Sequence, residues 1–212
     1  MQGESTALRH HPQENVLVEY STGTLHQAGS VLIATHLAMC PTCRAEVETL
    51  DAVGGALLSK IEPAEIADGL LDRVLSHIDE TPETDATSAG TTPSTQASVI
   101  PRPLRDFIGD DLSSLNWVED RPGIDRVDLP FGTDCIQAAL FRVRGGGSVP
   151  EHTHSGNELV LILAGELTDD DGSYRPGDVA QADESVTHAP FVPCSDSCIC
   201  LAIIEGGLDL DG

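Results

Sequence analysis

The stretch GGSVPEHTHSGNELVLILAG, residues 146–165, contains the pattern on which the interpretation of this chain depends. His152 and His154 are separated by one residue, and side chains two residues apart on a β-strand point to the same side. Glu158 follows four residues later and adds a carboxylate oxygen. Imidazole and carboxylate ligands suit Zn²⁺, Mn²⁺ or Fe²⁺, and they do not decide between these metals. The pattern therefore predicts a metal site inside a β-structure.

The residues around this stretch read as strands separated by turns. Glycine, proline and acidic residues divide short apolar runs, and short strands without intervening helices are typical of a small β-barrel. We expect this barrel to occupy residues 101–212. The predicted strands cover residues 136–144, 158–163, 189–192 and 198–205.

Residues 1–80 have a different pattern, in which apolar residues recur at helical spacing. Pro41 disfavours helix at Cys40 and suits the first position of the helix that follows. The sequence therefore predicts a small helical domain. The expected helices cover residues 12–22, 24–39 and 41–60, and a fourth begins at Pro63 and includes Ile78.

A linker is predicted between these two parts. The segment ETPETDATSAGTTPSTQASV, residues 80–99, is rich in threonine, serine, proline and acidic residues and nearly lacks large apolar side chains. Such a segment cannot bury enough surface to offset the entropy lost on ordering. We therefore expect a helical domain over residues 1–80, a flexible linker over 81–100 and an all-β domain over 101–212.

His36, Cys40 and Cys43 form a second group of metal-ligating side chains. His36 and Cys40 face the same side of a helix, and the turn at Pro41 lets Cys43 reach back toward them. Thiolate and imidazole ligands favour tetrahedral Zn²⁺. The alternative is two buried free thiols beside a surface histidine; a redox Cys-x-x-Cys is disfavoured because no βαβ pattern surrounds it. A closed site needs a fourth ligand, for which the candidates are His10, His11 and His26.

Residues from about 7 to 60 resemble the zinc-binding anti-sigma factors of the ChrR type, which carry an appended cupin domain. The resemblance rests on Arg9-His10-His11, Ala34-Thr35-His36-Leu37, Cys40-x-x-Cys43-Arg44 and the segment 50–55. It implies that His11 is the fourth zinc ligand, with His10 as the alternative. It also implies that the helical domain binds an extracytoplasmic-function sigma factor and blocks the access of this factor to core RNA polymerase.

The stretch from Gly146 to Gly165 fits the first cupin motif at every position. The resemblance implies a cupin barrel and places His188 as a fourth metal ligand from the second motif. That second motif departs from the general pattern, because Asp183, Ser185 and Val192 replace its usual proline, glycine and asparagine. ChrR-type cupins use such a ligand set for zinc, although manganese and iron stay possible. A metal-free cupin with histidines in its core is the alternative.

A late cysteine pair, Cys198-x-Cys200, also matches ChrR-type cupins. Residues two apart on a strand share a face, so the thiols lie close together, and we consider both as redox-sensing candidates. The resemblance implies release of the sigma factor by singlet oxygen or organic peroxides. Cys135 and Cys194 belong to neither motif.

The composition is strongly acidic, with 35 aspartates and glutamates against 11 lysines and arginines and a net charge of −24. Direct binding to nucleic acid needs cationic side chains, so this composition disfavours it. A partner protein with a basic surface would instead be attracted by the negative charge. Solubility alone is the other explanation of this acidity. The sequence shows no pattern of a signal peptide or membrane span, so we expect a cytoplasmic chain. In such a chain, six cysteines favour metal or redox chemistry over structural disulfides.

The sequence therefore predicts a cytoplasmic transcription regulator that is not an enzyme and holds two zinc ions. The rival hypothesis is a metal-dependent cupin enzyme, a dioxygenase or an isomerase. An aromatic content of 3% leaves few residues to enclose a substrate, and an enzyme gives no reason for the helical zinc domain. A zinc-finger DNA-binding protein is disfavoured by the acidity of residues 1–80.

Overall fold

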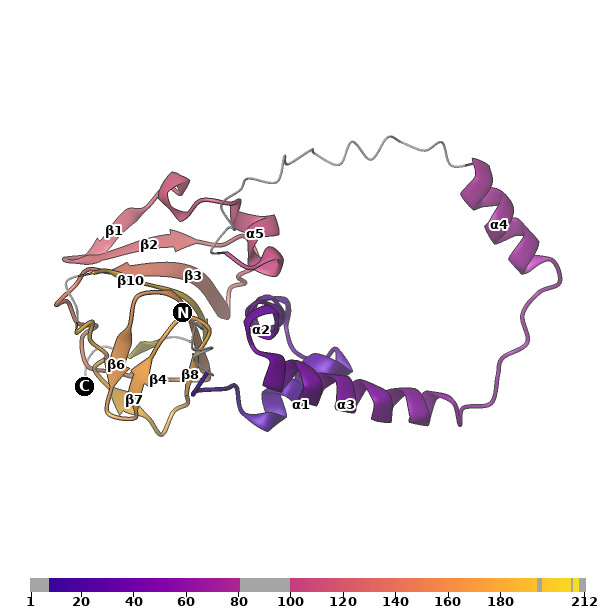
Figure 1. Ribbon diagram of the computed structural model, residues 1–212, viewed down its shortest axis with the longest axis horizontal. Coiled ribbons are helices and arrows are strands. Elements are labelled where there is room, and N and C mark those ends of the chain that lie inside the picture. Colours follow the sequence, from indigo (N-terminus) through magenta and orange to yellow (C-terminus); the bar gives the residue numbers. More distant parts are fainter. Residues whose placement is uncertain (1–7, 81–99, 194–195, 207, 210–212) are drawn as a thin grey trace, which may run out of the picture.

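The computed structural model describes residues 8–80, 100–193, 196–206 and 208–209 (Figure 1). Its first part is helical and its second part consists mainly of strands, as the sequence predicts. No helix in these ranges is long and apolar enough to cross a lipid bilayer. The helices are α1 (Glu14–Thr22), α2 (Gln27–Met39), α3 (Pro41–Leu58), α4 (Leu70–Glu80), α5 (Arg102–Ile108) and the short 3-10 helix η1 (Leu112–Ser114).

The strands of the described residues form three sheets. The largest has the strand order β1-β2-β3-β10-β5-β8, and the smaller ones have the orders β11-β4-β9 and β6-β7. Each strand pair found in the described residues is antiparallel. The strands are β1 (Val118–Arg121), β2 (Ile124–Asp128), β3 (Ile136–Val143), β4 (His152–His154), β5 (Glu158–Ala164), β6 (Leu167–Asp169), β7 (Gly172–Tyr174), β8 (Val179–Ala182), β9 (Thr187–His188), β10 (Cys198–Glu205) and β11 (Leu208–Asp209).

The junction between α2 and α3 is set by Cys40 and Pro41. Cys40 has an extended backbone, with φ −111° and ψ 102°, so it ends α2 and precedes α3. Pro41 occupies the first turn of α3, where its missing N–H breaks no helical hydrogen bond. The backbone N–H of Cys43 donates to the Cys40 sulfur at 3.4 Å. The junction therefore brings the two cysteines together at the N-terminus of α3.

Helix α2 is buried on nearly every side, which explains why its sequence lacks a clear apolar stripe. Leu32 and Ile33 are both fully buried, and so is His36 near the end of the helix. Within the helical part, α1 and α3 contact α2. From the second part of the chain, α5, β5 and β10 contact it as well. The helical part therefore packs directly on the barrel.

Strands β5 and β10 are covered on both faces, because they lie between α2 and the barrel interior. In β5, Leu159 and Leu161 pack in the apolar cluster that includes α2, whereas Val160 and Ile162 belong to the interior cluster. The side chains of β10 alternate in the same way between the two clusters. Burial on both faces accounts for the nearly unbroken apolar sequence of β5.

The predicted linker, residues 81–100, lies outside the described residues except for its last residue. Ile100 is buried, at 4% exposure, in the cluster that contains α2. Helix α5 follows directly and packs against α2 through the fully buried Leu104. The prediction of strands without helices beyond Ile100 is therefore wrong at α5. Pro103 in its first turn and the apolar pair Leu104 and Ile108, spaced four residues apart, are sequence signals of this helix.

Two other predicted elements differ from the structure. Helix α4 begins at Leu70 rather than at Pro63, because Gly69 has φ +71°, a conformation that a right-handed helix does not contain. The strand predicted over residues 189–192 is absent from the described chain: β9 ends at His188, and Phe191 makes only isolated bridges. Pro190 has no N–H to donate to a ladder, which disfavours a continuous strand there.

We expect Leu32→Ala to lower the free energy of unfolding by about 2–5 kcal/mol, because the lost side chain leaves a cavity between the helices and the barrel. Urea unfolding of the full chain measures this change. Leu71→Ala on α4 is the matched control, since Leu71 is 66% exposed and surface changes usually stay within about 0.5 kcal/mol. A Leu32→Ala protein as stable as its parent would contradict the central position of α2.

Candidate metal centres

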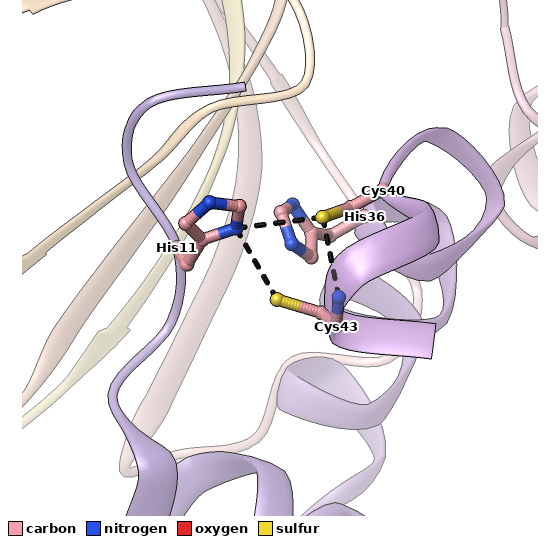
Figure 2. A group of neighbouring side chains, drawn as sticks. All are labelled: His11, His36, Cys40 and Cys43. Carbon is pink, nitrogen blue, oxygen red and sulfur yellow. Dashed lines mark hydrogen bonds between the residues drawn. The ribbon is translucent and has the colours of Figure 1, made fainter. Parts of the chain in front are cut away.

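Four side chains of the helical part meet at one point, as Figure 2 shows. His11 lies on the extended segment before α1, His36 is near the end of α2, and Cys40 and Cys43 belong to the junction with α3. The His11 Nδ1 is 3.4 Å from Cys40 Sγ and 3.3 Å from Cys43 Sγ. All four candidate ligand atoms lie within 4.8 Å of one another. The structure thus brings together the four residues that the sequence and the resemblance selected.

The spacing and burial of these atoms fit a tetrahedral metal ion. Bonds of about 2.0–2.3 Å to nitrogen and sulfur place the ligand atoms roughly 3.3–3.8 Å apart. The His36 Nε2 is buried and has no hydrogen-bond partner among the described residues, an arrangement that a metal bond would satisfy. Burial raises the pKa of the Cys43 thiol to about 12. Metal binding must therefore displace thiol protons.

The orientation of His36 is fixed from the barrel. Its Nδ1 lies 2.7 Å from the carbonyl oxygen of Gly177, in the turn before β8. Because a carbonyl only accepts, Nδ1 carries the proton and Nε2 keeps a free lone pair. Burial also lowers the pKa of His36, which keeps the ring neutral, as a metal ligand requires. This contact joins residues far apart in sequence, and no local pattern signals it.

The two other histidines considered as fourth ligands make different contacts. The ring of His10 packs against Tyr174, with ring centroids 4.3 Å apart. The His26 Nε2 lies 2.9 Å from the carboxylate of Glu205. His11 is therefore the histidine of this set that faces the two thiols.

A second group of candidate ligands lies inside the barrel. His152 and His154 are on β4, and the register of β4 with β9 places His152 opposite His188. The Nε2 atoms of His152 and His188 are 3.1 Å apart, and the His154 Nε2 is 3.1 Å from an oxygen of Glu158, at the start of β5. All four residues are largely or fully buried, and their ligand atoms lie within 4.8 Å of one another. The structure thus brings His188 to the other three despite its irregular motif.

The outer nitrogens of these histidines have partners that orient the rings. The Nδ1 of His152 lies 2.8 Å from the Pro150 carbonyl, and the Nδ1 of His154 lies 3.3 Å from the Val186 carbonyl. His188 differs, because its Nδ1 lies 3.5 Å from the carboxylate of Asp169. Such outer contacts set which nitrogen faces the metal. The sequence analysis missed Asp169, which reads only as part of a turn and has no fixed spacing to His188.

The charges in this group balance one another. Burial alone would raise the pKa of Glu158, but hydrogen bonds with His154 and His188 outweigh it and lower the pKa below its usual range. Burial likewise opposes the charged form of His188, yet Asp169 and Glu158 together raise its pKa. Glu158 is therefore an ionised carboxylate at neutral pH. A metal ion that binds here must displace the proton of His188.

The barrel ligands border a cavity of about 250 Å³. His152, Glu158 and His188 line it together with Asp169, and most of the remaining wall is apolar. Arg121 and Arg126 also belong to the lining, and both pair with Asp120. The barrel site can therefore admit a small molecule, whereas none of the helical ligands lines this cavity.

Cys198 and Cys200 point into the barrel interior from β10. Cys200 lines the cavity beside the candidate ligands. Burial raises the pKa of Cys198 to about 12 and also raises that of Cys200, so both thiols are protonated at neutral pH and react slowly as nucleophiles. Their redox role stays a prediction. Cys135 is exposed and distant from both groups in sequence, and Cys194 lies outside the described residues.

Comparison with known proteins links both parts of the chain to one kind of protein. The pattern of a family described as the ChrR cupin-like domain matches residues 107–205. The anti-sigma-E factor ChrR of Cereibacter sphaeroides is 35% identical over 95% of this chain and 92% of that protein. A chain in the crystal structure of Rhodobacter sphaeroides SigE in complex with the anti-sigma ChrR has a TM-score of 0.80 and 34% identity, covering 93% of this chain and 99% of that one.

We expect Asp169→Asn to weaken metal binding in the barrel by roughly 10–100-fold, the usual effect of losing an outer partner of a metal-binding histidine. Competition with a zinc chelator measures the affinity in a Cys43→Ser background, where the helical site lacks one ligand. Asp170→Asn is the control, because Asp170 is the exposed neighbour of Asp169. Equal affinities in the two variants would show that Asp169 does not support His188.

Proposed function

The chain belongs to the ChrR family of anti-sigma factors that carry a cupin domain, and from this membership we propose that it binds and inhibits an extracytoplasmic-function sigma factor. The observation that carries the proposal is a similarity that extends over the helical part and the barrel together. Holding the sigma factor away from core RNA polymerase would make the chain a regulator of transcription.

An exposed apolar surface on α3 and α4 supports this proposal. Leu57 and Leu58 at the end of α3 are 60% and 69% exposed, and the apolar residues of α4 are exposed as well. Figure 1 shows α4 standing apart from the other helices and from the barrel. A strongly amphipathic helix with an uncovered apolar face is typical of helices that dock in a groove of a partner protein. We assign this surface to the sigma factor. Its apolar residues on α4 are Leu71, Val74, Leu75 and Ile78.

The acidity of the chain agrees with a protein partner rather than nucleic acid. A net charge of −24 repels the phosphate backbone and attracts a basic protein surface, which raises the rate of association. We therefore propose that no nucleic acid or membrane is bound directly. The proposed site of action is the cytoplasm, where a sigma factor meets RNA polymerase.

We assign zinc to both centres. In the helical part, His11, His36, Cys40 and Cys43 form a closed set of protein ligands, which suits a structural ion that cross-links the N-terminal segment to the α2–α3 junction. In the barrel, the assigned ligands are His152, His154, Glu158 and His188, and manganese or iron is the alternative there. The proposed sigma-binding unit is residues 1–80 and the proposed sensing unit is residues 101–212, joined by residues 81–100.

The proposed signal for release is singlet oxygen or an organic peroxide. Imidazole and sulfur side chains are electron-rich groups that such oxidants attack, and the barrel gathers three histidines with Cys198 and Cys200 around its interior. Because both thiols are protonated, we place the histidine and glutamate group first in the response and the cysteines second.

A metal-dependent cupin enzyme is the second candidate, and the cavity of about 250 Å³ beside the barrel ligands favours it. A dioxygenase or isomerase would need such a space for its substrate next to an open coordination position. The enzyme hypothesis gives no role to the helical metal site. It is distinguished by turnover of a small molecule that disappears when the barrel metal is removed.

We expect the double variant Leu71→Asp, Leu75→Asp to bind the sigma factor at least about tenfold more weakly, because two charges would enter an apolar contact. Isothermal titration with an extracytoplasmic-function sigma factor encoded beside this chain provides the measurement. Val118→Asp is the control, since Val118 is a 60% exposed apolar residue on the barrel. If the α4 variant binds like the control, α4 is not the docking surface.

We expect Cys43→Ser to lose zinc from the helical site and to fail to inhibit sigma-dependent transcription in vitro, because small metal domains depend on the ion for folding. Cys135→Ser is the control: this cysteine is exposed and belongs to neither metal centre. Full inhibition by the Cys43→Ser protein would contradict a structural role for the ion.

A further inference from the structure

The turn between β7 and β8 contacts the segment that carries His11. Asp178 in this turn is 2% exposed, and its carboxylate Oδ1 accepts hydrogen bonds from the backbone N–H groups of Arg9 at 2.8 Å and His10 at 3.2 Å. The other oxygen accepts from the N–H of Arg175 at 3.0 Å. The N–H of Val179 in turn donates to the His10 carbonyl at 3.1 Å. Three hydrogen bonds therefore hold the backbone just before His11 against the barrel.

The same turn also holds the second histidine of the helical site. The carbonyl of Gly177 accepts the Nδ1 proton of His36 at 2.7 Å and leaves Nε2 to face the other ligands. Gly177 has φ +97°, and a Cβ atom there would lie 2.7 Å from Leu8 Cδ2 and 3.3 Å from Met39 Cε. Glycine is therefore needed on two grounds, the backbone conformation and the close approach to the helical part.

We infer that the barrel completes the metal site of the helical part: Gly177 and Asp178 are positioning residues that hold His36 and His11 for the ion. All four ligands belong to the first 43 residues, yet two of the four are oriented by a turn of the other domain. This inference rests on the proposed zinc site. It means that the helical site loses its metal more readily when the turn moves away.

The turn is also connected to the metal centre of the barrel. The N–H of Gly177 donates to the Ile162 carbonyl at 2.9 Å, and the N–H of Ile162 donates to the Asp178 carbonyl at 3.1 Å. Glu158 lies on the same strand, four residues before Ile162 and hence about 13 Å away. Strand β5 therefore joins a ligand of the barrel site to the residues that orient the helical site.

The test compares metal release from the full chain loaded with Co²⁺. Thiolate-to-cobalt absorption reports on a cysteine-containing site. The absorption that is lost in the Cys43→Ser variant defines the signal of the helical site. A strong chelator then starts release. We expect Asp178→Asn and Gly177→Ala to release this cobalt about 10–100-fold faster than the parent, the range expected when an outer partner of a ligand is lost. Glu184→Gln is the control, because it removes an exposed carboxylate of the barrel.

Release from the barrel site in the same samples separates positioning from general unfolding. Faster release from the helical site alone supports the inference. Parental release rates in both variants would overturn it, and so would loss of both metals together with loss of far-UV circular dichroism. The result is independent of sigma binding: a chain that binds no sigma factor but shows site-specific release would remove the proposed function and leave this inference standing.

Discussion

Helix α2 is apolar on nearly every side, so other elements must shield nearly every side of it from water. Burial of each large side chain such as Leu32 or Ile33 contributes roughly 1.5–3 kcal/mol, so leaving one face of the helix in water would be costly. The cover comes from α1 and α3 on one part of the surface and from α5, β5 and β10 on the rest. This requirement seats the helical part on the barrel. It also places His36, near the end of α2, within hydrogen-bond distance of a barrel carbonyl.

The two metal centres differ in what surrounds them. The helical group is closed: none of its four ligands lines the cavity, and the outer nitrogen of His36 is paired with a barrel carbonyl. The barrel group opens on a cavity, so molecules from solution can approach its ligands. A closed ligand set is typical of a structural metal ion, whereas an open one is typical of a metal ion that binds small molecules from solution. Strand β5 lies between these environments, with Glu158 and Ile162 facing the interior and Leu159 and Leu161 facing α2.

Local spacing was enough to predict most of both ligand sets. His152, His154 and Glu158 lie within seven residues, and His36, Cys40 and Cys43 within eight, so strand or helix periodicity determines where each side chain points. The contacts that support these ligands could not be predicted, because Gly177 and Asp169 are brought to His36 and His188 by tertiary folding alone. The docking of the two parts was also hidden: an apolar run such as β5 indicates burial but does not say which element covers it. The false start of α4 at Pro63 arose because a glycine can continue an apolar pattern while its backbone conformation interrupts the helix, as Gly69 does.

The hydrogen bond between His36 and Gly177 joins residues that are 141 positions apart in the chain. A ribosome adds about 5–20 residues per second, so roughly 7–30 s of synthesis separate the two. During that interval the helical segment has been synthesised and its barrel support has not. A nascent chain can then acquire its ion, or meet a partner made nearby, before the barrel supports His36 and the segment of His11. The order of synthesis along the chain can therefore influence which metal ion or partner protein is bound, in addition to the equilibrium affinity for each.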